Sequence, residues 1–190
     1  MKEKLTLRNV ILWTAALVLL ILFLVSFGAR AKLSAVIEGY PIAYVFKHII
    51  WGCDYAYATG EGGLSIPSGF RAVSVPGIIG ALLFLLAAGG LVVCSLLIKN
   101  EKLRKILIFV CAGAILFGSA LMFFVQLAAW KQMATIMETS VDAAKAQLKQ
   151  MGFKASSGYG VGAGIVGILF AAAVVGTQTF IPEVKFIKSK

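Results

Sequence analysis

Titratable side chains that could carry out chemistry are scarce in this sequence. It contains one histidine, His48, and three cysteines, Cys53, Cys94 and Cys111. A catalytic site needs several titratable groups that converge in one pocket, and a lone cysteine in an outer loop cannot build a disulfide framework. His48, Cys53 and Asp54 are close in sequence, but their spacing fits no zinc-ligand pattern. We therefore expect no catalytic residue, no metal site and no cofactor.

Charge is also sparse. Only 14% of the 190 residues are charged and 60% are hydrophobic, whereas soluble domains usually carry about 25% charged and 45–50% apolar residues. So much apolar surface exceeds what one small core can bury, and part of it must face lipid. The net charge of +10 does not indicate a nucleic-acid partner, because no basic patch is interleaved with aromatic residues and basic residues collect beside membrane spans.

Four stretches contain no Asp, Glu, Lys, Arg or His: residues 9–28, 76–98, 106–130 and 160–181. Each has the roughly 20 residues that a helix needs to cross the hydrocarbon layer. All four prolines lie outside these stretches or at their edges, where they do not interrupt a helix. The chain is therefore expected to be an all-α membrane protein, a four-helix bundle forming a single membrane domain over residues 1–190.

The first stretch also resembles a signal peptide, with a basic start and an Ala-x-Ala pattern at residues 29–31. Its apolar run of about 18 residues is longer than the usual 7–15. We interpret it as a retained anchor.

The basic residues predict the orientation. Four spans place both termini and the connector around residues 99–105 on one side of the membrane. That side holds ten of the 18 Lys and Arg residues in a short length of chain. Because positive charge near short loops stays cytoplasmic, we expect cytoplasmic termini in the plasma membrane, with KNEKLRK (residues 99–105) as a tight cytoplasmic turn.

The first outer loop, about residues 29–75, is rich in aromatic and β-branched residues, which favour strands. We expect a small cap containing short strands, with TGEGG (residues 59–63) as a turn; an interfacial helix over residues 42–51 is the alternative. Its aromatic residues suit the headgroup layer or a binding surface. The candidate interaction residues in this loop are Tyr44, Trp51, Tyr55 and Tyr57.

The second outer loop, about residues 131–159, carries an apolar stripe at helical spacing from Trp130 to Met151 that includes Met137 and Leu148. Thr139 and Ser140 resemble a fresh helix start, so we expect a break near residues 138–140. The stripe either packs internally or meets a partner, and Met137 and Leu148 complete the candidate interaction surface. ASSGYGVGAG (residues 155–164) is interpreted as a glycine-rich linker back into the membrane.

Small residues predict how the spans pack. Lipid provides no hydrophobic drive for helix association, so close backbone contact matters. Gly160, Gly164, Gly167 and Ala171 follow one face of the fourth span. This face is expected to pack against the other helices; the alternative is dimerisation or docking to another membrane subunit.

The layout resembles that of claudin-type tetraspan proteins: a cytoplasmic N-terminus, a longer first outer loop, a short inner turn, a shorter second outer loop and a cytoplasmic tail. Trp51, Gly52 and Cys53 are similar to a cluster in the first loop of that family, and Arg71 lies shortly before the second span. The family carries two loop cysteines as a disulfide, and this loop has only Cys53. The resemblance therefore implies a topology and no specific function. The sequence also suits an uncharacterised family of bacterial inner-membrane proteins.

These patterns predict a non-enzymatic accessory, scaffolding or cell-surface interaction protein. Its expected partners are the lipid bilayer and another membrane protein or a second copy of itself. The alternative function is a small transporter or channel subunit, with a continuous cavity lined by polar span residues: Gln126, Gln178, Thr177 or Ser119.

Overall fold

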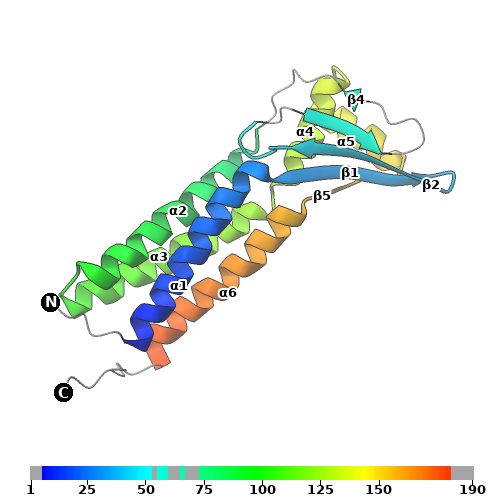
Figure 1. Ribbon diagram of the computed structural model, residues 1–190. Helices are drawn as coiled ribbons and strands as arrows, with labels where there is room; N and C mark the ends of the chain where they lie inside the picture. The colour runs from blue at the N-terminus through cyan, green and yellow to red at the C-terminus, as the bar shows by residue number, and fades with distance from the viewer. Residues whose placement is uncertain (1–5, 53–54, 60–64, 67–72, 181–190) are drawn as a thin grey trace.

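The computed structural model describes residues 6–52, 55–59, 65–66 and 73–180. Most of the chain is helical. Long helices form an elongated bundle, and a β-sheet with two further helices sits at one end of it (Figure 1). We call that end the cap, which comprises the five strands together with helices α4 and α5.

Four helices of the described chain are long and apolar enough to cross a membrane, as predicted. They are α1 (Leu7–Val25), α2 (Val75–Leu96), α3 (Glu101–Met122), which continues through a turn into α4 (Leu127–Ile136), and α6 (Gly158–Phe180). Helix α2 packs between α1 and α3, α3 packs against α6, and α1 and α6 make a smaller contact.

The connection between α2 and α3 is shorter than predicted. Asn100 caps α3 by accepting hydrogen bonds from the backbone N–H groups of Lys102 and Leu103. The helix therefore begins at Glu101, and most of the expected turn over residues 99–105 belongs to its first two turns. Glu101 and Lys105, one turn apart, form an ion pair of 3.8 Å.

The cap contains a five-stranded antiparallel sheet in the order β4-β3-β2-β1-β5. The strands are β1 (Arg30–Ile37), β2 (Tyr40–Lys47), β3 (Tyr55–Thr59), β4 (Ser65–Ile66) and β5 (Lys154–Ser156). Strands were expected here, but the alternative helix over residues 42–51 is wrong, and a purely all-α class is too narrow. Residues 60–63 of the predicted TGEGG turn lie outside the described residues.

A two-residue turn joins β1 to β2. Glu38 and Gly39 both have positive φ, 51° and 87°, the backbone that tight hairpins prefer because it matches the twist of the strands. The turn pairs Ile37 with Tyr40 and fixes the register of the whole hairpin.

The predicted helix break in the second outer loop is confirmed. Helix α4 ends at Ile136, and α5 (Val141–Gln150) begins after Ser140, whose side chain accepts a hydrogen bond from Ala143 N–H. The expected linker over residues 155–164 is wrong. Strand β5 occupies its start, and α6 begins at Gly158 because Ser157 Oγ accepts a hydrogen bond from Gly160 N–H.

Candidate functional site

The two faces of the sheet differ sharply. Along β1, Ala31, Leu33 and Ala35 are buried, whereas Arg30 and Lys32 are exposed. Successive side chains of a strand point to opposite faces, so this alternation defines a covered face and an uncovered face. Helices α4 and α5 lie on the covered side (Figure 1).

Three of the predicted interaction residues belong to the covered side. Tyr44 stacks on Phe153 with ring centroids 5.7 Å apart. The N–H of Phe153 donates to the carbonyl oxygen of Leu148, whose residue is only 4% exposed. Met137, after the end of α4, is half-buried against the core. These side chains hold the cap together, and Leu148 offers almost no surface to a partner.

Trp51 anchors the cap to α1. Its ring stacks on Phe27, with centroids 4.9 Å apart, and meets the edge of Phe23. Its Nε1–H donates to Ser26 Oγ at 2.8 Å. His48 Nδ1 lies 2.6 Å from the carbonyl oxygen of Phe27. The segment that follows β2 is thereby fastened to the end of α1, and Trp51 is only half exposed.

The remaining predicted interaction residues, Tyr55 and Tyr57, lie on β3. In the register they stand opposite Lys47 and Val45, and Val45 stands opposite Lys32. The register thus aligns these two positions with Arg30 and Lys32 across the sheet. Tyr44 pairs with Ala58, which lies between Tyr57 and Thr59.

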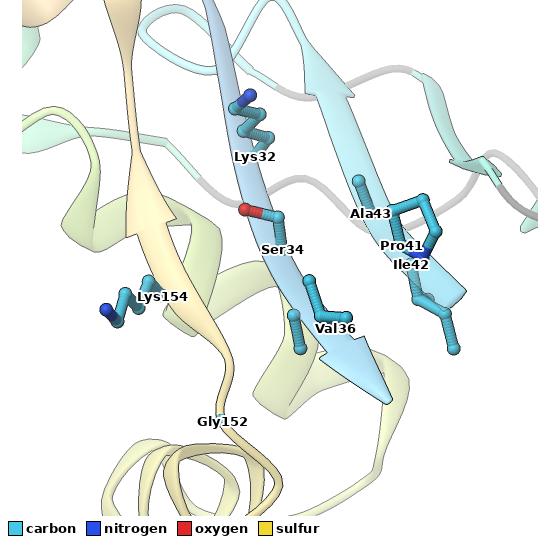
Figure 2. Close-up of a pocket in the computed structure, with 9 residues that line it drawn as sticks. Lys32, Ser34, Val36, Pro41, Ile42, Ala43, Gly152 and Lys154 are labelled. Carbon is cyan, nitrogen blue, oxygen red and sulfur yellow. The ribbon is translucent and has the colours of Figure 1, made fainter. Parts of the chain in front are cut away.

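An open hollow of about 620 Å³ lies beside β1, β2 and β5 (Figure 2). Lys32, Ser34 and Val36 line it from β1, and Lys154 lines it from β5. Ser34 pairs with Lys154 on one side and with Ala43 on the other. The uncovered face is thus basic near the bundle and apolar toward the hairpin tip.

Sequence reasoning missed this basic face. Its signal was present in RAKLSAVI (residues 30–37), where Arg30, Lys32 and Ser34 alternate with apolar residues in the two-residue period of a half-buried strand. The contribution of Lys154 had no such signal, because it depends on pairing between strands 120 residues apart.

The glycines predicted to pack helices lie against α3. A Cβ at Gly160 would stand 2.6 Å from the carbonyl oxygen of Met122, and one at Gly164 would stand 2.8 Å from the ring of Phe123. Gly167 faces Ser119, and Ala171 is also buried. This face of α6 is therefore occupied within the chain.

The polar span residues do not come together. Ser119 Oγ donates to the carbonyl oxygen of Ile115 and lies against Gly167. Thr177 and Gln178 are ten or more residues farther along α6, which is about 15 Å at 1.5 Å per residue. Gln126 is half-buried at the bend between α3 and α4. The described positions do not form the continuous polar line that a channel subunit predicts.

The two described cysteines adjoin each other. Cys94 on α2 and Cys111 on α3 are free thiols that share a side-chain hydrogen bond between the two helices. Cys53 and Asp54 lie outside the described residues, so the spacing around His48 stays a sequence observation.

Comparison of the chain with protein-family models, with curated proteins and with solved structures gives no match. The four-helix layout is thus what the chain shares with tetraspan proteins.

Proposed function

We propose that this protein is a non-enzymatic accessory protein of the plasma membrane, with both termini in the cytoplasm and the cap outside. Its work would be to bind and position another membrane component or a second copy of itself at the cell surface. The likeness to claudin-type tetraspans supports this arrangement through topology, and we transfer no junctional or channel function from it.

The observation that carries the proposal is the joining of both outer segments into one folded cap. Strand β5, from the second segment, pairs with β1, from the first. Ser157 Oγ donates to the carbonyl oxygen of Arg30 at 2.8 Å and also caps α6. A cap fixed to α1 and α6 in this way can present one face in a constant orientation, which is what a docking module requires.

The partner would meet the distal part of the uncovered face. Val36 is 71% exposed there, and Pro41, which pairs with it beside the hairpin turn, is also exposed. Large exposed apolar side chains grouped at the tip of a folded element are typical of interaction sites. The covered face is already filled by Tyr44, Phe153 and Leu148.

Site-specific photo-crosslinking in native membranes tests the proposal. A photoreactive residue at Val36 is expected to capture one protein in stoichiometric amount, whereas the same residue at Leu86, which is 68% exposed on α2, captures lipid. Equal diffuse labelling from both positions, or none at Val36, contradicts the accessory function.

A second candidate, a small transporter or channel subunit, is favoured by one observation. Gln178 is buried near the end of α6, its Nε2 contacts Thr177 Oγ1 at 3.4 Å, and its Oε1 has no hydrogen-bond partner among the described residues. Buried polar groups of this kind often mark pathways in membranes. Solute flux in reconstituted vesicles that is lost in Gln178→Leu would support this alternative.

A further inference from the structure

We propose that the base of the uncovered sheet face binds the headgroup of an anionic phospholipid from the leaflet on the cap side. Arg30, Lys32 and Lys154 would contact the phosphate, and the acyl chains would lie along the ends of α1 and α6. This site is independent of the accessory function and of which side of the membrane the cap faces.

Among the residues that the structure describes, the charged side chains at the base of this face are basic. Arg30, Lys32 and Lys154 are exposed, and none of them forms an ion pair with a described carboxylate. The nearest acidic residue along the hairpin is Glu38, at its far end. The three cations lie on adjacent strands, since Lys32 pairs with Ser156 and Ser34 pairs with Lys154. A phosphate is the complementary ligand for such a group.

Two hydroxyl groups adjoin the cations. Ser34 lines the hollow beside Lys154 (Figure 2). Ser156 Oγ, at the position opposite Lys32, is shielded from water and has no hydrogen-bond partner among the described residues. A buried hydroxyl without a partner is unfavourable, and a phosphate bound beside Lys32 would give Ser156 Oγ an acceptor.

The chain places Arg30 at the level of the headgroup layer and Lys154 beyond its outer edge, from where its side chain would extend back toward it. Arg30 follows the short 3₁₀ helix η1 (Ser26–Gly28) by two residues, and Lys154 precedes α6 by four. At about 3.3 Å per residue these separations are roughly 7 Å and 13 Å. The headgroup region is about 5–8 Å thick on each side, and Lys and Arg side chains reach toward it along their apolar stems.

Apolar surface that could hold the acyl chains lies on the helix ends that adjoin the basic strands. Leu24, Val25 and Phe27 are exposed at the end of α1, and Val161 and Ile165 are exposed near the start of α6. The two helices are tied at this level because Tyr159 Oη donates to the carbonyl oxygen of Leu22 at 2.6 Å. Helix α1 leads through η1 into β1, and β5 leads into α6 (Figure 1), so exposed apolar residues of the helices are followed along both segments by exposed basic residues of the strands. This continuity favours a lipid over an acidic protein segment.

The test is lipid retention by the full chain, measured by native mass spectrometry after reconstitution with equal phosphatidylglycerol and phosphatidylcholine. Wild type is expected to prefer phosphatidylglycerol by roughly tenfold or more, as three basic residues at a membrane surface imply. The variant Arg30→Gln/Lys32→Gln/Lys154→Gln should lose this preference. The control variant Lys131→Gln/Lys145→Gln/Lys149→Gln removes the same charge from α4 and α5 and should keep it.

Three results would overturn the proposal: no preference in wild type, equal loss in both triple variants, or an acidic protein that displaces the lipid from the basic strands. Thermal unfolding of both variants in detergent shows whether each is folded. If the first variant unfolds, Lys32→Gln alone, on an exposed side chain, should still weaken the preference several-fold, and an unchanged preference would contradict the site.

Discussion

The glycines of α6 differ in whether an added side chain would have room. A glycine that touches the neighbouring helix is needed for packing, and one that faces open space is not. Gly160 faces the backbone of α3 at its end, where a Cβ would meet a carbonyl oxygen that cannot easily move. Gly162, two residues later, has nothing within 4 Å. The same residue type therefore has two different roles within one helical turn.

We predict that Gly160→Ala destabilises the protein by about 1–3 kcal/mol, because overpacking forces backbone shifts. Gly162→Ala should be neutral or stabilising by up to about 1 kcal/mol, since alanine favours the helix. Thermal unfolding in mild detergent measures both. Equal effects of the two substitutions would show that α6 does not pack on α3 through this face.

The contact between Trp51 and Ser26 is a second feature of single residues. Trp51→Phe keeps a ring over Phe27 but removes the donor to Ser26 Oγ, whose residue is fully buried. We predict a coupling energy of about 1 kcal/mol between Trp51→Phe and Ser26→Ala, the usual size for one such hydrogen bond. Unfolding of the wild type, both single variants and the double variant gives this value, and strictly additive effects would contradict the contact.

At the scale of elements, α5 depends on the residue that caps its N-terminus, Ser140. The helix has ten residues, which is too short to be stable alone in water, and it begins at the hydrogen bond from Ala143 N–H to Ser140 Oγ. Packing of Ala144 and Leu148 holds its other side.

Ser140→Ala is therefore expected to cost about 1 kcal/mol and to speed hydrogen exchange of the α5 amides. Thr139→Ala is the matched control, because Thr139 is exposed and its side chain caps no helix in the described chain. Exchange of α6 amides should not change in either variant. Faster exchange in the Thr139 variant alone would place the helix start one residue earlier.

The elements differ in how far the sequence predicts them. The spans and the break at Ser140 follow from local patterns: uncharged length and a capping residue. The bend at residues 123–126 does not, because FFVQ contains neither proline nor glycine. There the N–H groups of Phe124 and Val125 bond three residues back, at the level where Gly160 packs on α3. The bend is thus a product of tertiary packing.

The candidate site was only partly predictable for the same reason. Aromatic content indicated a surface at Tyr44 and Trp51, but composition cannot tell which face of a sheet a helix will cover. The structure places Tyr44 under Phe153 and leaves the basic alternation of β1 uncovered. The start of α6 resembles a linker because four of residues 155–164 are glycine, and composition does not show where between Gly158 and Gly160 the helix begins.

At the scale of the whole molecule, orientation is the testable property. In intact cells, a membrane-impermeant maleimide is expected to label Cys53, and Cys53→Ser should abolish the labelling because Cys94 and Cys111 lie in α2 and α3. A tag after Lys190 should be cleaved by protease only once the membrane is permeabilised. Cleavage of the tail in intact cells, with Cys53 unlabelled even after unfolding, would invert the topology.

The pairing of β5 with β1 also sets the order in which the molecule can be assembled. Ser34 and its partner Lys154 are separated by 120 residues, so at about 5–20 residues per second the ribosome needs roughly 6 to 24 s to supply the missing strand. Until then the β1 edge is open, and open edges recruit strands from other chains. A nascent chain that stalls before β5 therefore carries an incomplete sheet with an open edge that can pair with other chains. Because β5 directly precedes α6, insertion of α6 also brings the strand that completes the sheet.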